Sequence, residues 1–412
     1  MPRLLIVAPT FFPDPGVQSV RVTQWARTLP DLGWETHILC RHYGYEATPE
    51  RLAQYVHPDV RLHYLGPKRP APPAGRIAGA PRRGVAAELQ RQAERFFVPD
   101  ITLLSWRRLA VEAVETAQSI APDVILSSSP PHSIHWIGRH LAQATGAKWA
   151  ADFRDPYALD DRFVPGGWLT PLTLLHQRHE RQIYRDADLT IHAIPIHGRW
   201  SRRHYTDRRG PAELLPNGAP SDLQGLAAEL PPRPPEAPLE LRSVGQIADD
   251  APQALYEAIK RLRAEGLPLR FLHAGHLPAG VAELPVDHGD FMTFLGLVPH
   301  DEAMRLVVGA DLLLAYLSEK RSRHLLLTSK LFEYLGACKP VLVVNPTRPD
   351  RQFLKRRSGC VSVSHPNTEE LATAIRSLAE PSRSSRPTEL EAIYDRRQQT
   401  AMLSEWLRQL ID

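Results

Sequence analysis

The sequence has few cysteines and no long apolar run. Its three cysteines, Cys40, Cys338 and Cys360, lie far apart, so they predict neither a disulfide framework nor a metal-binding cluster and fit a reducing cytoplasm. No run of about 18 apolar residues is present, so no segment is expected to span a bilayer. The apolar start at residues 4–8 is too short for a signal-peptide core and leads into a proline-containing loop, which favours a buried first strand.

The sequence also lacks a strong excess of charge of one sign. It has 50 Lys and Arg residues against 46 Asp and Glu residues, a formal net charge of +4 at pH 7. A small positive excess suits phosphorylated ligands or an anionic membrane surface. It is far from the signature of a nucleic-acid-binding protein, and no RNA- or DNA-binding motif is present, so no nucleic-acid partner is expected.

Short apolar runs alternate with helical patterns along most of the 412 residues, a length that favours two domains. In the first half we predict strands at residues 4–8, 36–40, 61–65, 124–128, 148–152 and 189–193, and helices at 17–32, 103–120, 132–144 and 169–185. In the second half we predict strands at 239–244, 269–274, 291–295, 312–316 and 340–344, and helices at 252–263, 301–309, 329–337, 368–378 and 390–410. The alternation predicts an α/β protein with two Rossmann-like, doubly wound domains, each built on a parallel sheet.

Changes in composition suggest the domain boundaries. We predict an N-terminal domain over residues 1–210, a C-terminal domain over 211–385, and a final helix within 386–412 that crosses back to the first domain. Residues 220–238, rich in Pro, Ala and Glu, are expected to connect the domains. Residues 66–100 form a Pro- and Arg-rich insertion, for which a surface loop leading into a helix is favoured over a basic, aromatic membrane-surface patch.

The loop after the first strand can bind phosphate. Residues 9–21 turn at proline and glycine and then enter a helix, whose free backbone N–H groups attract anions. Gly16 would let the backbone approach a ligand closely, while Ser19 and Arg21 would add polar and charged contacts. A tight turn that binds no ligand is the alternative.

A second phosphate-binding candidate lies at residues 328–335. Thr328 or Ser329 can cap a helix whose first turn holds Lys330, a cation that opposes the helix dipole. A bound diphosphate would remove this conflict, and Glu333 on the same face could accept hydrogen bonds from ribose hydroxyls. The alternative is a surface Lys–Glu pair, worth only about 0.2–0.5 kcal/mol.

Polar residues follow two consecutive predicted strands. His132 lies after the strand at 124–128, and Asp152, Arg154 and Asp155 end or follow the strand at 148–152. The carboxyl ends of strands are where an α/β sheet presents functional groups, so these side chains are candidates for contacting a sugar, an acceptor or phosphate. For His132, a hydrogen bond at a helix start is the alternative.

Together these segments resemble glycosyltransferase family 4, whose members share the GT-B fold, two Rossmann-like domains facing across a cleft. Residues 1–41 resemble the family's first strand, loop and helix. Further along, the resemblance rests on RDADLT (185–190), LLPNG (214–218), FLGLVP (294–299) with ADLLL (310–314), and SKLFEYLGA (329–337) with KPV (339–341). These motifs cover nearly the whole chain in the family's order.

The resemblance implies a retaining transfer from a nucleotide-diphosphate-sugar co-substrate, with no metal and no other cofactor. Lys330 would face the diphosphate, Glu333 the ribose, and Gly16 the reacting phosphate, with His132 near the transferred sugar. We group the candidates as catalytic (His132, Asp152, Arg154), acceptor-binding (Asp155) and donor-binding (Gly16, Ser19, Arg21, Gly245, Arg323, Thr328, Ser329, Lys330, Glu333).

Two departures from the family pattern stand out. Many members carry an Arg and a Lys after the glycine that corresponds to Gly245, whereas this chain continues QIADD (246–250). Many also have a glutamate about two turns before Glu333, where this chain has Leu325. Some diphosphate contact is therefore expected from Arg323, Arg154 or Arg21.

The resulting expectation is a retaining glycosyltransferase of bacterial envelope polysaccharide or glycoconjugate biosynthesis. Its acceptor would be a carbohydrate, a lipid-linked molecule or a natural product. It would act in the cytoplasm, with peripheral contact at the inner face of the membrane as an option. A sugar-nucleotide epimerase of the same fold, or a non-catalytic nucleotide-sugar-binding partner of another transferase, are the alternatives.

Overall fold

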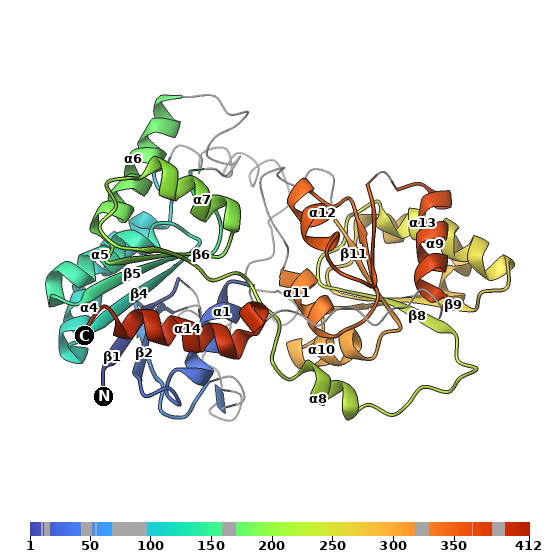
Figure 1. Cartoon of the computed structure of the whole chain (residues 1–412), viewed down its shortest axis with the longest axis horizontal. Coiled ribbons are helices and arrows are strands. Elements are labelled where there is room, and N and C mark those ends of the chain that lie inside the picture. Colours follow the sequence, from blue (N-terminus) through green and yellow to red (C-terminus); the bar gives the residue numbers. More distant parts are fainter. Residues whose placement is uncertain are drawn as a thin grey trace. The chain divides into compact units, whose positions relative to one another are not determined.

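The computed structural model describes residues 1–9, 11, 17–42, 52–53, 56–67, 97–158, 170–317, 329–364, 366–380 and 392–412. The chain divides into two compact units (Figure 1). The first contains Met1–Pro216 and Arg397–Asp412, and the second contains Asn217–Arg396. The chain therefore leaves the first unit after Pro216 and returns to it at Arg397.

The first unit is built on a parallel sheet with the strand order β3-β2-β1-β4-β5-β6-β7. Its strands are β1 (Arg3–Val7), β2 (Glu35–Arg41), β3 (Arg61–Leu65), β4 (Val124–Ser129), β5 (Lys148–Phe153), β6 (Leu189–His192) and β7 (Ala212–Leu214). The chain winds outward in opposite directions from the neighbouring strands β1 and β4. Their carboxyl ends therefore form the switch point at which such sheets bind ligands.

Helices cover both faces of this sheet because alternate strand residues point to opposite sides. Leu4 and Ile6 of β1 pack in one core cluster with side chains of α1 (Val17–Thr28) and α14 (Arg396–Arg408). Leu5 and Val7 pack in the other with α4 (Leu103–Ile120), α5 (Ile134–Thr145) and α6 (Pro171–Asp186). The helix α7 (Pro195–His204) follows β6.

The second unit contains a parallel sheet with the strand order β10-β9-β8-β11-β12-β13. Its strands are β8 (Leu239–Val244), β9 (Leu269–Ala274), β10 (Met292–Gly296), β11 (Leu312–Tyr316), β12 (Val341–Val344) and β13 (Cys360–Val363). The switch point lies between β8 and β11. Its helices are α8 (Leu223–Ala228), α9 (Ala251–Ala264), α10 (His300–Val308), α11 (Ser329–Gly336), α12 (Arg348–Leu354) and α13 (Thr368–Ala379), with short 3-10 turns η2 (Ala279–Glu283), η3 (Val286–Asp290) and η4 (Ala392–Tyr394).

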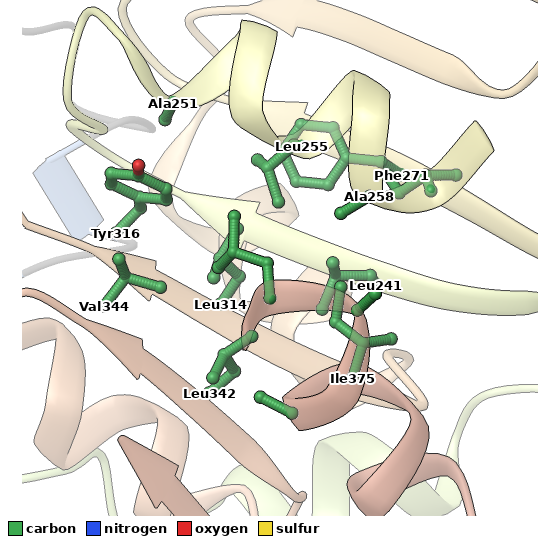
Figure 2. Packing of buried hydrophobic residues seen from close by; sticks show 14 of the residues in the cluster. Leu241, Ala251, Leu255, Ala258, Phe271, Leu314, Tyr316, Leu342, Val344 and Ile375 are labelled. Atoms are coloured by element: carbon green, nitrogen blue, oxygen red, sulfur yellow. The ribbon is translucent and has the colours of Figure 1, made fainter. Parts of the chain in front are cut away.

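Apolar side chains hold the second unit together on both faces of its sheet. Figure 2 shows one face, where Leu255 of α9 and Ile375 of α13 pack with Leu314 and Leu342 of the central strands. On the other face, α8, α10, α11 and α12 cover the strands. The two helix-covered parallel sheets confirm the predicted α/β, doubly wound fold class.

The structure corrects several predicted element boundaries. The helix predicted at 17–32 ends at Thr28, because Pro30 disfavours a helical conformation at the residue before it. The helix predicted at 132–144 begins at Ile134, after a turn at His132, and the final α-helix begins at Arg396 rather than 390. Five short elements were not predicted: the strands β7 and β13 and the helices α7, α8 and α12. Four of them have three to seven residues, and α7 has ten residues with few apolar positions. Segments of this kind show little hydrophobic periodicity.

Residues 220–238 do not form a simple connection between the units. They contain α8, whose Leu223 is buried in a cluster with Met304 and Val307 of α10. The change of unit occurs earlier, between Pro216 and Asn217. The Pro- and Arg-rich insertion at residues 66–100, predicted as a surface loop that leads into a helix, lies mostly outside the described residues. Among the helices that are described, none combines the length and the apolar composition needed to cross a membrane.

We expect the returning helix α14 to be essential for the stability of the first unit. Leu403 is fully buried in the core that contains Trp34, and the Trp34 Nε1 donates a hydrogen bond of 2.8 Å to the Ser404 Oγ. Leu403→Ala should lower the free energy of unfolding by about 2–5 kcal/mol through lost burial and a cavity. Glu405→Ala, at an exposed position of the same helix, should change it by no more than about 0.5 kcal/mol. Equal effects in urea unfolding would contradict this placement.

Candidate functional site

Two glycines meet at the carboxyl ends of β8 and β9 in the second unit. A Cβ atom on Gly275 would lie 2.0 Å from the carbonyl oxygen of Gly245, so no side chain fits there. Gly245 has φ +84, a conformation that favours glycine, and its N–H donates to the carbonyl of Ala274 at 2.7 Å. The absence of a side chain at Gly275 therefore lets the two strand ends pack backbone against backbone beside the switch point.

The helix α11 is fixed to this turn by polar contacts. The Tyr334 hydroxyl accepts a hydrogen bond of 2.7 Å from the backbone N–H of Val244, and burial raises the pKa of Tyr334. The Lys330 Nζ donates to the carbonyl of Gln246, and its Cε lies 3.5 Å from where a Cβ on Gly245 would be. The structure thus brings together Gly245 and Lys330, two predicted donor-binding residues.

Glu333 lies one turn beyond Lys330 on α11. Its Oε1 accepts a hydrogen bond of 2.9 Å from the Nη2 of Arg396, the first residue of α14. Both side chains are largely buried, with 14% and 10% exposure. Arg396 was not predicted as a site residue, and it lies 63 residues from its partner in the chain.

The loop after Gly245 carries no cation, as its sequence indicates. The Asp249 carboxylate accepts from the backbone N–H of Ala279 at 3.0 Å. Burial lowers the pKa of the nearby His273 to about 4, and the charge of Lys330 acts in the same direction. His273 is therefore neutral at pH 7, and Lys330 supplies positive charge at these strand ends.

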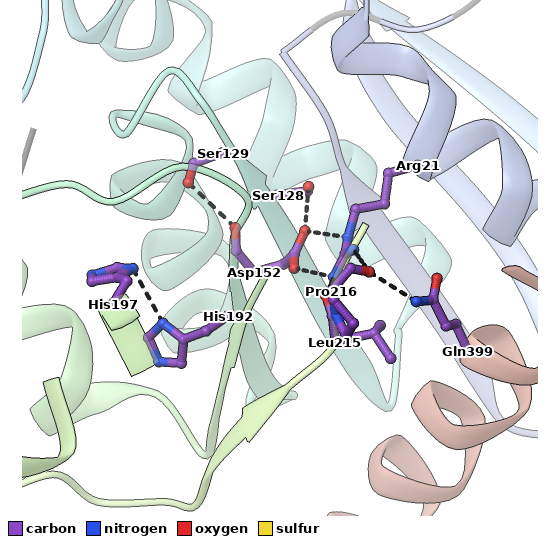
Figure 3. A network of polar contacts seen from close by, with 9 residues as sticks. All are labelled: Arg21, Ser128, Ser129, Asp152, His192, His197, Leu215, Pro216 and Gln399. Atoms are coloured by element: carbon purple, nitrogen blue, oxygen red, sulfur yellow. Dashed lines mark hydrogen bonds and ion pairs between the residues drawn. The ribbon is translucent and has the colours of Figure 1, made fainter. Parts of the chain in front are cut away.

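In the first unit, Asp152 and Arg21 form a buried ion pair (Figure 3). The Nη2 and Nε of Arg21 donate to the two carboxylate oxygens at 2.9 and 3.2 Å, and Ser128 Oγ donates at 2.7 Å. Arg21 also donates to the carbonyls of Leu215 at 2.8 Å and Pro216 at 3.2 Å. The structure therefore brings these two predicted site residues together as an ion pair. Arg21 uses its remaining contacts on the carbonyls of Leu215 and Pro216, where the chain leaves the unit.

Arg154 and Asp155 follow β5 at partly exposed positions. Burial lowers the pKa of Arg154, whereas the charges of Asp155 and Asp152 favour its protonated form. A guanidinium keeps its charge under such conditions. This cluster therefore presents a cation beside two carboxylates at the carboxyl end of β5.

His132 lies after β4, on one side of the first unit's switch point. Its ring is 2% exposed and stacks on that of Tyr157, with 4.2 Å between the ring centroids. His132 thus follows β4, and its ring belongs to a packed aromatic layer.

Other histidines lie in the same layer between the sheet and helices α5, α6 and α7. Burial lowers the pKa of His135 to about 3 and the pKa of His192 well below its usual value, so both rings are neutral at pH 7. The buried Glu180 accepts from His197 Nε2 at 2.9 Å and from the Tyr205 hydroxyl at 2.7 Å. The part of the chain that is described contains no group of three or more His, Cys, Asp or Glu residues arranged to hold a metal ion.

For five predicted donor-binding residues, either the whole residue or its side chain lies outside the described structure. Gly16, Arg323 and Thr328 lie outside the described residues, and the side chains of Ser19 and Ser329 are not described. Besides Arg396, the sequence analysis missed Gln399, whose Nε2 donates to the Pro216 carbonyl at 2.9 Å. Both missed residues belong to α14, and their partners are far away in the sequence, so no local pattern could reveal them.

Comparison with known proteins gives the fold a name. No protein-family model matches the chain, and no curated protein matches it. Solved structures do match over nearly the full length. Sucrose-phosphate synthase from Thermosynechococcus elongatus has a TM-score of 0.64 and 16% identity, covering 100% of this chain and 99% of that one.

Two further solved structures also match over nearly the full length of this chain. The Anabaena protein HepE, solved with UDP and glucose, has a TM-score of 0.57 and 13% identity, covering 100% of this chain and 97% of its own. A putative UDP-N-acetylglucosamine 2-epimerase from Listeria monocytogenes has a TM-score of 0.58 and 11% identity, covering 97% and 94%. The chain has the GT-B fold. At these identities the likeness establishes the fold alone.

We expect that removing one partner of the Arg21–Asp152 ion pair lowers the free energy of unfolding substantially. Arg21→Met should leave the buried Asp152 carboxylate uncompensated and lower the free energy of unfolding by about 3–5 kcal/mol. Adding Asp152→Asn should recover part of the loss, because both charges are then gone. Arg27→Met, at an exposed position of the same helix, is the control. A loss below about 1 kcal/mol for Arg21→Met in urea unfolding would refute the expectation.

Proposed function

We propose that the protein is a glycosyltransferase that transfers a sugar from a nucleotide-diphosphate-sugar to an acceptor hydroxyl, with retention of configuration and without a metal. The observation that carries the proposal is the group formed by Gly245, Gly275, Lys330 and Glu333 at the switch point of the second sheet. It combines two adjoining glycines at the strand ends, a cation at a helix start and a carboxylate one turn further along. These are the features that a nucleoside diphosphate requires.

In this proposal each residue has a defined task. The diphosphate lies at the start of α11 against Lys330 and the backbone at Gly245, where the helix dipole and the ammonium favour negative charge. Glu333 accepts hydrogen bonds from the ribose hydroxyls.

The proposed reaction places negative charge on the leaving diphosphate. The bond between the anomeric carbon and the diphosphate breaks, and the diphosphate leaves with the electron pair. The acceptor oxygen bonds to the same face of the sugar and transfers its proton to an oxygen of the leaving diphosphate. Lys330 and the α11 N-terminus stabilise the charge that develops on the leaving group, as an oxyanion hole does.

The first unit would provide the acceptor side. We propose that His132 lies close to the transferred sugar, that Arg154 and Asp155 orient the acceptor or contact phosphate, and that Asp152 holds this strand end in place through Arg21. The acceptor class remains a carbohydrate, a lipid-linked molecule or a natural product. The proposed setting is envelope polysaccharide or glycoconjugate assembly in the cytoplasm or at the inner face of the membrane.

A sugar-nucleotide epimerase is the second candidate. It is favoured by the likeness to a structure titled as a putative UDP-N-acetylglucosamine 2-epimerase. An epimerase converts its nucleotide-sugar without an acceptor, so incubation with the donor alone separates the two activities. Binding without any turnover would indicate a non-catalytic partner of another transferase.

We expect one nucleoside diphosphate to stabilise the protein in the presence of EDTA. In a thermal-shift screen of UDP, GDP, ADP and dTDP, ligand at about 100 times its dissociation constant should add about 2.7 kcal/mol of stability. Lys330→Ala should weaken binding roughly 10- to 100-fold through loss of a charged hydrogen bond. Lys355→Ala, an exposed lysine of the same unit, should leave binding unchanged. No shift with any nucleotide would refute the proposal.

We expect His132 to affect turnover more than donor binding. His132→Ala should lower kcat at least about tenfold, because a positioned polar group near the reacting sugar is lost, while donor affinity stays within about twofold. His140→Ala, an exposed histidine of α5, is the matched control. If His132→Ala retains full kcat once a donor and an acceptor are known, His132 has only a packing role.

A further inference from the structure

The C-terminal segment that precedes α14 lies against α11. The ring of Tyr394 packs on Phe332 of α11 and on Phe353 of α12, with centroid distances of 5.1 and 5.6 Å. Arg357 of α12 lies over the rings of Phe353 and Tyr394. The segment 392–396 is thus held on the two helices that flank the candidate nucleotide site.

Backbone hydrogen bonds fix the same segment from the other end. The N–H of Ala219 donates to the carbonyl of Tyr394 at 2.8 Å, and the N–H of Arg396 donates to the carbonyl of Ala219 at 3.1 Å. Ala219 also forms a parallel bridge with Asp395. The backbone of Arg396 is therefore set before its side chain reaches α11.

The Arg396 side chain ends on the carboxylate of Glu333. Its Nη2 donates to Oε1 at 2.9 Å, and the two side chains are 10% and 14% exposed. An exposed ion pair contributes little because its side chains must be ordered and water screens the charges. Here the pair is shielded and one backbone is already fixed, so the guanidinium can hold the carboxylate in one orientation.

We propose that Arg396 is a positioning residue of the nucleotide site, which it completes from the C-terminal segment of the chain. By occupying one oxygen of Glu333, it directs the other toward the 2′ and 3′ hydroxyls of a nucleoside diphosphate. This inference rests on the proposed function of Glu333. It makes residues 392–396, which lie outside every motif of the sequence, part of the site that recognises the ribose.

The test compares a nucleotide with its form lacking both hydroxyls. The probes are whichever of UDP, GDP or ADP binds in the thermal-shift screen and its 2′,3′-dideoxy counterpart, titrated by calorimetry against the full chain. In the unaltered protein the ribose form should bind about tenfold or more tightly. Arg396→Met should reduce this preference to about twofold or less and leave the affinity for the dideoxy form within about twofold.

Two further variants show whether Arg396 acts through Glu333. Glu333→Gln should also lose the preference, and the double variant Glu333→Gln/Arg396→Met should lose no more than Glu333→Gln alone, since residues that act as a unit are not additive. Arg357→Met removes another arginine that packs on the same segment and should keep the preference. If Arg396→Met does not fold, Arg396→Lys serves in its place, and it should lower the preference at least about threefold because it lacks the planar donors.

The outcomes are distinct. An unchanged ribose preference in the Arg396 variants overturns the inference, as does an equal loss of affinity for both nucleotide forms, which would assign Arg396 to the phosphate charge. Loss of the preference in Arg357→Met would also overturn it, because general loosening of the segment would then suffice. Failure of the unaltered protein to bind any nucleotide would instead refute the proposed function itself.

Discussion

The buried ion pair between Arg21 and Asp152 is the constraint on which the first unit depends. A guanidinium inside a protein needs partners for its donors, and Arg21 finds them on the Asp152 carboxylate and on the carbonyls of Leu215 and Pro216. One side chain therefore ties α1, the carboxyl end of β5 and the exit of the chain into a single arrangement. Such a pair adds little net stability over an apolar core, but it allows few alternative geometries.

In the second unit, glycines and a tyrosine hydroxyl, rather than an ion pair, hold the strand ends and a helix together. The backbone after β8 lies close to that after β9, which the missing side chain of Gly275 permits, and Gly245 adopts a φ of +84 that favours glycine. The hydroxyl of Tyr334 then fastens α11 to the end of β8. With the helix fixed, Lys330 and Glu333 of the same motif lie at the carboxyl ends of the strands, with Lys330 beside Gly245.

Hydrophobic patterning predicted most of the fold, because buried parallel strands are short apolar runs separated by helices. The strands Leu239–Val244, Leu269–Ala274 and Leu312–Tyr316 have the predicted bounds. The edge strands Ala212–Leu214 and Cys360–Val363 were missed, because strands of three and four residues are too short to show a recognisable hydrophobic pattern. The capping box of Thr347 and Asp350 was a local signal that could have revealed the helix Arg348–Leu354.

The sequence by itself determined the class of the longer, periodic elements and the local grouping of Lys330 with Glu333, because these depend on periodicity and on spacing within one helix. Tertiary structure alone decided which distant charges meet. Arg21 and Asp152 are 131 residues apart, and Glu333 and Arg396 are 63 apart. Ion pairing has no period along a chain, so these partners follow from the order of strands in the sheets and from the path of the returning C-terminal segment.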